Sequence, residues 1–349
     1  MGKAPDRSAN VFFVGAGVPS AFGLPNTQEL LALAHELAER RAYWGRTKRI
    51  GEELEAAYGY FYPVEAAEVG SGFRPNVTDF FSVLTMYEEV TSGLPDRGLE
   101  RGAELLLDLR RAIAFVLRER LRDNDSILKK DHPYLEAMLQ PGNLIVTSNW
   151  DVLLERYAFH HDIPLRFVVR RPEKEVTLLK LHGSIDWTAY ASIPRRRGRL
   201  RWPIGDYAPL QQRVFGPRTY RIRPSRDEDP IWRVDIHDHW TEAWRRMKSR
   251  SLEPLMVTMS LGKSQQMTHL ESVWRDAYSA ISRARNLEVV GYSLPADDLE
   301  IRTLLIAGLR RGSEDATIVV RNPSPEVHER FRFFINRGIE ADYQPVPPP

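Results

Sequence analysis

A run of four apolar, β-prone residues at 11–14 leads directly into Gly15, Ala16 and Gly17. A short buried strand followed by a glycine turn is how a nucleotide-binding βα unit begins. Glycines let the backbone approach a pyrophosphate without a Cβ in the way, and the N–H groups of the following helix can hold that phosphate. Gly23 lies six residues after Gly17, which is not the spacing of an ordinary dinucleotide-binding loop. A tight turn without a ligand is therefore the alternative explanation.

The second half of the chain repeats this strand signal. Short apolar runs, typical of strands buried in a parallel sheet, occur at 143–147, 165–169, 176–181, 255–259, 287–291 and 317–320. Helical stretches separate several of them. Together with residues 11–14 they predict an α/β fold with a doubly wound, mostly parallel Rossmann-like sheet of six or seven strands. Ligands of such sheets bind at the carboxyl ends of the strands.

Two stretches interrupt this alternation within a single predicted domain of residues 1–349. Residues 42–140 indicate a helical insertion module between the first two core strands, and Asn26, with Glu29 three residues on, is expected to cap the helix before it. Residues 188–252 are basic and proline-rich, which predicts an insertion of loops and short strands. The basic stretch 195–201 has three explanations: a nucleic-acid contact, a contact with an acidic partner surface, or a solvated loop.

The histidines outside the core motifs do not indicate a metal centre. His132 precedes a proline in a predicted loop and is expected at the surface. His237 and His239 would share one face of a strand, as metal ligands need to, but no further ligand cluster lies near them in the sequence. We therefore predict no metal site.

Composition excludes several classes of protein. The chain of 349 residues has no cysteine, which excludes disulfides, thiolate zinc sites and cysteine nucleophiles. A net charge of +2 gives no general attraction to nucleic acid or membrane. The first ten residues are polar, and no apolar run approaches the length of about 20 residues that a membrane helix needs. These features predict a soluble, cytoplasmic protein.

Six short motifs follow one another in a fixed order along the chain. They are Gly15-Ala16-Gly17, Gly23-Leu24-Pro25, Thr147-Ser148-Asn149-Trp150-Asp151, Lys180-Leu181-His182-Gly183-Ser184, Gly291-Tyr292-Ser293-Leu294-Pro295 and Arg321-Asn322-Pro323. This series resembles the sirtuin superfamily, and most of all its cysteine-free bacterial branch that hydrolyses NAD in anti-phage defence. The resemblance covers roughly residues 10–36 and 140–325.

The resemblance implies roles for individual residues. Asn149 and Asp151 match the positions that face the nicotinamide ribose, and His182 matches the catalytic base. The implied cofactor-binding residues are Gly15, Ala16, Gly17, Ser20, Gly23, Pro25, Asn26, Thr147, Gly291, Ser293 and Asn322. Of these, the first three would lie under the pyrophosphate, Gly291 and Ser293 near the phosphates and adenosine, and Asn322 at the adenine ribose.

The sequence also departs from the sirtuin pattern. Pro19 stands where a serine is usual, which leaves Ser20 as its substitute, and Asn26 stands where deacetylases have aspartate. Taken one at a time, Asn149 also fits a strand-end cap and His182 a turn histidine.

The chemistry of these side chains suits cleavage of the bond between nicotinamide and ribose. That bond breaks with oxocarbenium character, so the site must orient the ribose and admit one nucleophile. An amide can both donate to and accept from ribose hydroxyls, and imidazole can remove a proton near neutral pH. Deacetylating sirtuins carry a four-cysteine zinc module, which this chain cannot build. We therefore expect NAD as the substrate, no zinc, and hydrolysis to nicotinamide and ADP-ribose.

Two alternative functions and several partners stay open. The first alternative is a non-catalytic sensor or scaffold that binds NAD or ADP-ribose. The second is a DNA-acting subunit of a defence complex that binds through residues 195–201. Because a constitutive NAD hydrolase would kill its host, activity must be gated, and we expect a homo-oligomer with contacts through the two insertions. The resemblance implies a partner such as a HerA-type ring ATPase or a short Argonaute, and no membrane.

Overall fold

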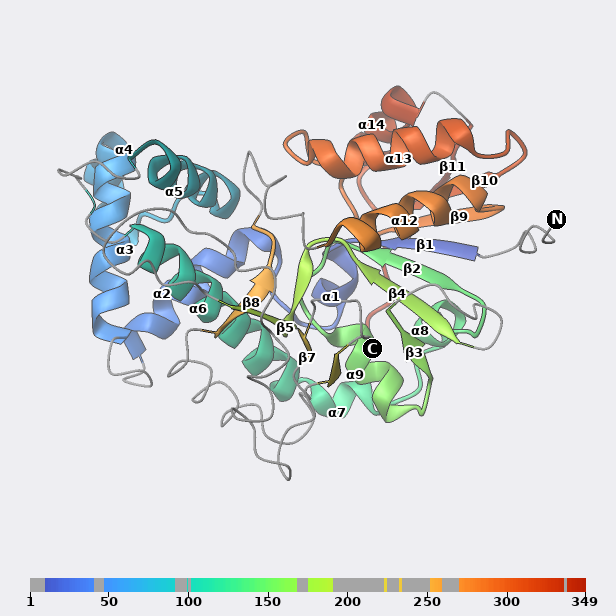
Figure 1. Ribbon diagram of the computed structural model, residues 1–349, viewed down its shortest axis with the longest axis horizontal. Coiled ribbons are helices and arrows are strands. Elements are labelled where there is room, and N and C mark those ends of the chain that lie inside the picture. Colours follow the sequence, from blue (N-terminus) through green and yellow to red (C-terminus); the bar gives the residue numbers. More distant parts are fainter. Residues whose placement is uncertain are drawn as a thin grey trace. The chain divides into compact units, whose positions relative to one another are not determined.

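The computed structural model describes residues 10–40, 47–91, 99, 102–167, 175–190, 223–224, 232–233, 252–258, 270–335 and 338–349 (Figure 1). The chain divides into two compact units. The first, which we call the sheet unit, comprises Met1–Asn26, Arg120–Gly183 and Leu270–Pro349. The second, the helical unit, comprises Thr27–Glu119 and Ser184–His269.

The sheet unit is built on seven parallel strands in the order β11-β10-β9-β1-β2-β4-β3. They are β1 (Asn10–Val14), β2 (Leu144–Thr147), β3 (Leu165–Arg166), β4 (Val176–Lys180), β9 (Asn286–Val290), β10 (Thr317–Arg321) and β11 (Glu340–Asp342). β1 lies in the middle, with Val14 paired to Thr147 on one side and to Val290 on the other. The α/β, Rossmann-like fold predicted from the sequence is confirmed.

Helices cover both faces of this sheet and bury much of its central strands. All residues of β2 and β4 are buried. On one face lie α12 (Glu271–Arg283), α13 (Leu299–Arg311) and α14 (Pro325–Ile335); on the other lie α8 (Pro133–Met138) and α9 (Leu153–His160) (Figure 1). The helical spacing of Ile301, Leu304, Leu305 and Leu309 gives α13 its buried apolar stripe.

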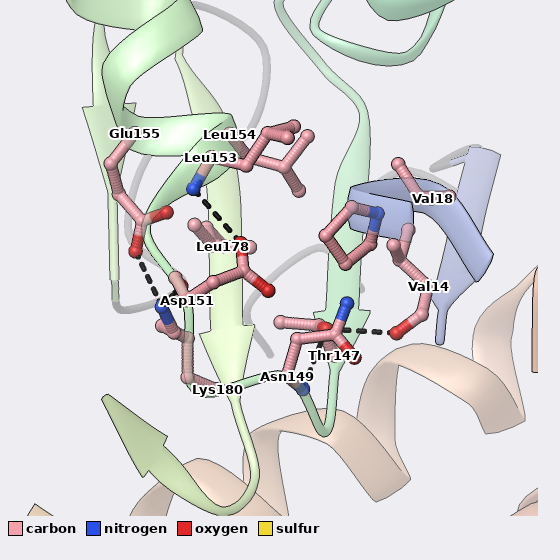
Figure 2. A pocket seen from close by; sticks show the side chains of 11 residues that line it. Val14, Val18, Thr147, Asn149, Asp151, Leu153, Leu154, Glu155, Leu178 and Lys180 are labelled. Atoms are coloured by element: carbon pink, nitrogen blue, oxygen red, sulfur yellow. Dashed lines mark hydrogen bonds and ion pairs between the residues drawn. The ribbon is translucent and has the colours of Figure 1, made fainter. Parts of the chain in front are cut away.

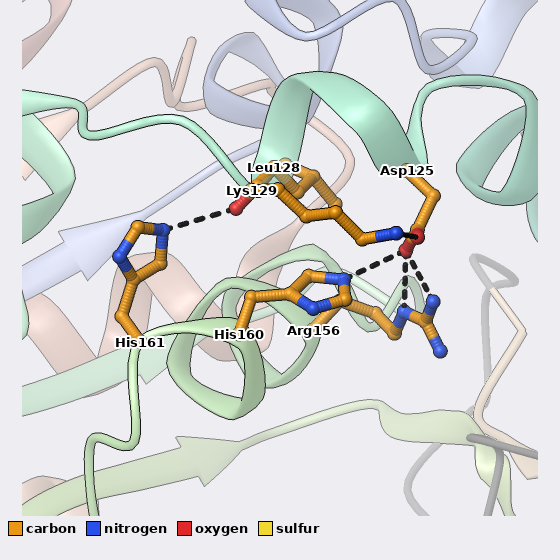
Figure 3. A network of polar contacts seen from close by, with 6 residues as sticks. All are labelled: Asp125, Leu128, Lys129, Arg156, His160 and His161. Carbon is orange, nitrogen blue, oxygen red and sulfur yellow. Dashed lines mark hydrogen bonds and ion pairs between the residues drawn. The ribbon is translucent and has the colours of Figure 1, made fainter.

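A polar network ties α9 to the short helix α7 (Asp125–Leu128) (Figure 3). The Asp125 carboxylate accepts hydrogen bonds from the Arg156 guanidinium and from His160 Nε2 at 2.9 Å, and Lys129 Nζ lies 3.1 Å from it. Burial acts to raise the pKa of Asp125, but the bonds from Arg156, His160 and Lys129 outweigh it and hold that pKa well below its usual value. This network fixes the outer side of α9.

The helical unit contains most of the chain between β1 and β2. Its helices are α2 (Thr27–Arg40), α3 (Thr47–Phe61), α4 (Pro63–Val69), η1 (Gly70–Gly72), α5 (Val77–Thr91) and most of α6 (Gly102–Asp123). A four-stranded sheet of order β6-β7-β5-β8 joins β6 (Arg223–Pro224), β7 (Trp232–Arg233), β5 (Gly183–Tyr190) and β8 (Leu252–Met256). The helix predicted to begin after Asn26 is confirmed as α2.

Some sequence-based expectations about the fold were wrong. The apolar run at 255–259 was expected in the parallel sheet, but its strand, β8, belongs to the four-stranded sheet, since an apolar run does not specify its partner. The strands β5 and β11 are not among those predicted from the sequence. His132 was expected at the surface but is only 6% exposed, because Nδ1 accepts from Leu135 N at the start of α8 and Nε2 lies 3.3 Å from Pro347 O.

Other expectations stay predictions. The insertion boundaries 42–140 and 188–252 are not decided by the structure. Most of the basic insertion, with 195–201, His237 and His239, lies outside the described residues. In the part of the chain that is described, no helix combines the length and apolarity needed to cross a membrane.

Two helical glycines yield a stability prediction. A Cβ on Gly308 of α13 would lie 2.7 Å from Ile281 Cγ2 of α12, whereas a Cβ on Gly59 of α3 would meet nothing within 4 Å. Gly308→Ala should therefore lower the free energy of unfolding by about 1–3 kcal/mol through overpacking. The matched control Gly59→Ala should raise it by about 0.5–1 kcal/mol through helix propensity. Urea denaturation measures both, and effects of the same sign would contradict the helix packing described.

Candidate functional site

The motif residues of the sheet unit gather at one edge of the sheet. Because its strands are all parallel, their carboxyl ends share that edge, which is where ligands of open α/β sheets bind. Gly15 follows β1, Asn149 follows β2, His182 follows β4, Gly291 follows β9 and Asn322 follows β10. The strand order also reverses direction beside β1, which makes this point the switch point of the sheet.

The loops after β1 and β9 meet backbone to backbone. Gly15 N donates to Val290 O at 2.9 Å, and Gly17 N donates to Gly291 O at 2.8 Å. A Cβ on Gly15 would lie 2.5 Å from the Cα of Tyr292, and one on Gly17 would lie 2.7 Å from the Cα of Gly291. Gly291 itself has a φ of +61°. Packing alone therefore requires glycine at these three positions.

This contact affects the phosphate-binding role that was predicted for the glycine loop after β1. The N–H groups of Gly15 and Gly17 are already bonded within the protein, so neither is directed at a ligand. Ala16 O accepts from Ser20 N at 3.1 Å at the start of the short helix α1 (Gly17–Ala21). The phosphate-binding role of this loop stays a prediction, and other groups of the loop would have to supply the contact.

Thr147 and Asn149 attach the β2 loop to the β1 loop (Figure 2). Thr147 Oγ1 donates to Val14 O at 2.8 Å and accepts from Asn149 N at 3.0 Å. Asn149 Nδ2 donates to Gly15 O at 3.0 Å. The side chain of Asn149 is half-buried, so its amide is held by the protein through Nδ2 while the residue still reaches the surface of the site.

Asp151 lies two residues further on, at the start of α9. Its side chain is buried, and Oδ1 accepts from Leu153 N at 2.9 Å. Lys180, the last residue of β4, donates to the Asp151 carbonyl oxygen and forms an ion pair with Glu155 at 2.8 Å. Burial raises the pKa of the Asp151 carboxyl, and the Lys180 charge acts in the opposite direction.

These side chains line one pocket of the sheet unit, drawn in Figure 2. The pocket holds about 240 Å³ of empty space, including space open to solvent. Its lining comprises Val14, Val18, Pro19, Thr147, Asn149, Asp151, Leu153, Leu154, Glu155, Leu178 and Lys180.

His182 is buried but does not line this pocket. It follows Leu181, whose N–H extends the sheet by donating to Thr147 O at 2.8 Å and whose carbonyl accepts from Trp274 Nε1 at 2.9 Å. The His182 side chain is 1% exposed, and its ring lies 6.2 Å from the Trp274 ring. The structure thus brings Thr147, Asn149 and Asp151 together in one pocket, whose lining does not include His182.

The four cofactor contacts predicted in and just after α1 differ in exposure. Ser20 and Gly23 are exposed, and Gly23 has a φ of +78° that favours glycine. Pro25 is buried, and Asn26 is half-buried. None of these four residues lines the pocket, so their cofactor contacts stay predictions.

Ser293 and Asn322 both form hydrogen bonds within the sheet unit. Ser293 is exposed, and its carbonyl accepts from Arg330 at 3.0 Å. Asn322 Oδ1 accepts from Ser324 N at 3.0 Å in the turn into α14, and its carbonyl lies 2.7 Å from His328 Nε2. The turn accounts for the asparagine without a ligand, so the adenine-ribose contact also stays a prediction.

Sequence reasoning gave no role to Lys180 or Glu155, although both line the pocket. A signal was present: Lys180 ends a strand that is apolar except for Thr177, and a lysine at the end of a buried strand needs a partner. The identity of the partner was not readable, because Glu155 lies 25 residues earlier in the chain. As for metals, no group of three His, Asp or Glu side chains suited to an ion occurs among the described residues.

Comparison with known proteins finds likeness only among solved structures. No protein-family model matches the sequence, and no curated protein matches it. A Sir2 homologue in complex with NAD is 17% identical with a TM-score of 0.33, and the match covers 98% of this chain and 86% of that one. A serine-to-alanine mutant of a Sir2 homologue with ADP-ribose is 13% identical with a TM-score of 0.37, over 98% and 88%. Likeness at this level says nothing about this chain's ligands or activity.

The raised pKa of Asp151 predicts how replacing its carboxyl group affects the stability of the fold. The folded protein holds this proton more tightly than the unfolded chain does, so folding loses stability as pH rises from the ordinary aspartate value through the raised pKa. Asp151→Asn keeps an oxygen for the Leu153 N–H and should be at least as stable as wild type at pH 7. Its advantage should shrink as pH falls, as thermal unfolding across pH will show.

Asp125→Asn is the matched control, because the pKa of Asp125 is shifted in the opposite direction. Asp125 stabilises the fold at neutral pH, and that contribution is lost as pH falls through its lowered pKa. This variant should be less stable than wild type at pH 7 and approach it in acid. If Asp151→Asn behaves in the same way as Asp125→Asn, the assignment of burial as the dominant influence on Asp151 is wrong.

Proposed function

We propose that this protein is a sirtuin-like NAD hydrolase that cleaves the bond between nicotinamide and ribose to give nicotinamide and ADP-ribose. The observation that carries the proposal is the single pocket in which Asn149 and Asp151, from the loop after β2, lie against the glycine loop after β1. The ordered motifs of the sequence supply the sirtuin resemblance, and the parallel sheet brings the loops of five of those motifs to one edge.

The polar groups that line the pocket suit the reacting ribose of NAD. Because Asn149 Nδ2 is held by Gly15 O, its Oδ1 is oriented by the protein and can accept from a ribose hydroxyl or from the attacking water. Positive charge develops on the ribose as the bond breaks, and its stabilisation is assigned to the oxygens of the buried Asp151 carboxyl, which lines the same pocket. Water adds to ribose C1′, nicotinamide leaves with the bonding electrons, and one proton is released.

His182 is assigned the removal of that proton. It follows β4, the neighbour of β2 in the sheet, so the loops that carry it and Asn149 are adjacent at the same edge. Because His182 is buried and does not line the pocket, the assignment implies that substrate binding opens a path to its ring. The absence of cysteine from the sequence leaves hydrolysis favoured over deacetylation, for which sirtuins use a cysteine zinc module.

The biological role that we propose is that of an NAD-depleting effector in bacterial anti-phage defence. It rests on the sirtuin resemblance of the sequence. The same resemblance underlies the proposed homo-oligomer and the proposed control by a HerA-type ring ATPase or a short Argonaute. Gating by assembly fits a hydrolase whose unrestrained activity would be lethal.

The assigned roles are tested by single substitutions. Asn149→Ala and His182→Ala should each lower NAD turnover by about 100-fold or more, because each removes a group that acts on the reacting atoms. Purified protein is incubated with NAD, alone and with the product of its neighbouring gene, and nicotinamide and ADP-ribose are separated by chromatography. Asn10→Ala is the control, since Asn10 lies at the opposite end of β1 from the site.

The outcomes separate the two classes of function. If both variants still hydrolyse NAD, the roles assigned to Asn149 and His182 are wrong. Wild-type protein whose unfolding temperature rises with NAD, but which releases no nicotinamide under any activating condition, would instead be a sensor or scaffold. Circular dichroism of each variant establishes that lost turnover is not lost folding.

A further inference from the structure

Lys180 carries a buried charge in the wall of the pocket (Figure 2). Its side chain is 1% exposed, and its ammonium joins two elements: it donates to the carbonyl oxygen of Asp151 and lies 2.8 Å from Glu155 Oε1 on α9. Glu155 is 9% exposed, so both partners of this ion pair are withdrawn from water.

Stability is a poor explanation for such a pair. Removing two charges from water costs several kcal/mol per ion, and their attraction often does no more than offset it. Apolar residues of similar volume would fill the same space at no loss of stability or with a gain. What an apolar side chain would not supply is a donor for the Asp151 carbonyl.

That carbonyl belongs to a segment that lies outside the regular helices and strands. Residues 148–152, between β2 and α9, form neither helix nor strand, and they carry both Asn149 and Asp151. At the β2 end, Thr147 Oγ1 bonds Asn149 N and Val14 O and so fixes the segment to β1. At the α9 end, Lys180 fixes it to β4.

We infer that the Lys180–Glu155 ion pair is a positioning device that holds residues 148–152, and with them Asn149 and Asp151, in the arrangement the reaction needs. Glu155 orients the ammonium from α9, and the ammonium holds the backbone of Asp151. The effect on turnover rests on the proposed function, whereas the effect on the order of residues 148–152 does not.

The test removes both charges together. Lys180→Met/Glu155→Gln keeps the volume of both side chains and avoids the single buried charge that would destabilise a one-residue variant. The control is Asp125→Asn/Arg156→Met, which removes another ion pair of α9 whose residues do not line the pocket (Figure 3).

Hydrogen exchange read by mass spectrometry gives a result that does not depend on activity. In the Lys180→Met/Glu155→Gln variant, the amides of residues 148–153 should exchange about tenfold faster or more, while those of β2 and β4 exchange as in wild type. The control should leave 148–153 unchanged. Faster exchange throughout the sheet unit, or none at 148–153, would overturn the inference.

Turnover of NAD gives the second result. If wild type hydrolyses NAD, kcat of the Lys180→Met/Glu155→Gln variant should fall about tenfold to 100-fold with KM changed by less than about threefold, since misplaced reacting groups affect the transition state more than binding. The control should stay within about twofold. An unchanged kcat would overturn the inference. If wild type does not hydrolyse NAD, the proposed function fails and hydrogen exchange alone decides the positioning role.

Discussion

The contact between the loops after β1 and β9 is the constraint on which the candidate site depends. Gly15, Gly17 and Gly291 bring two backbones closer than any side chain allows, at the middle of the sheet where the strand order changes direction. The carbonyl of Gly15 also accepts a hydrogen bond from Asn149, which holds the loop after β2 against the loop after β1. Three segments far apart in the sequence thus form one edge, and the pocket lies beside it.

This constraint changes how the glycine motif is interpreted. A glycine-rich loop after a strand is usually explained by a phosphate, but here the N–H groups of Gly15 and Gly17 bond to the β9 strand and loop and a Cβ would strike backbone. Asn322 is similar, because the turn into α14 explains it. These residue types therefore follow from the fold as much as from a nucleotide. Asn149 and Asp151 differ, because their polar groups are placed in the wall of a pocket.

The pocket concentrates polar groups that stability alone does not favour. Asp151, Glu155 and Lys180 are all buried, and burial raises the pKa of Asp151 against the opposing charge of Lys180. Local conflicts of this kind are expected at functional sites, where the rest of the fold compensates for them. The apolar strands β2 and β4, buried along their whole length, supply that compensation and hold the polar loops between rigid elements.

The sequence by itself determined the α/β class, the strands β1, β2, β4, β9 and β10, and the fact that motif residues follow strand ends. These features are local, because a continuous apolar run or a helical period is contained in neighbouring residues. Only the tertiary structure decided that β8 joins the four-stranded sheet, that His132 is buried under the C-terminal segment, and that Lys180 reaches Glu155 and Asp151. Each of these depends on groups distant in the chain, whose meeting is set by how whole elements pack.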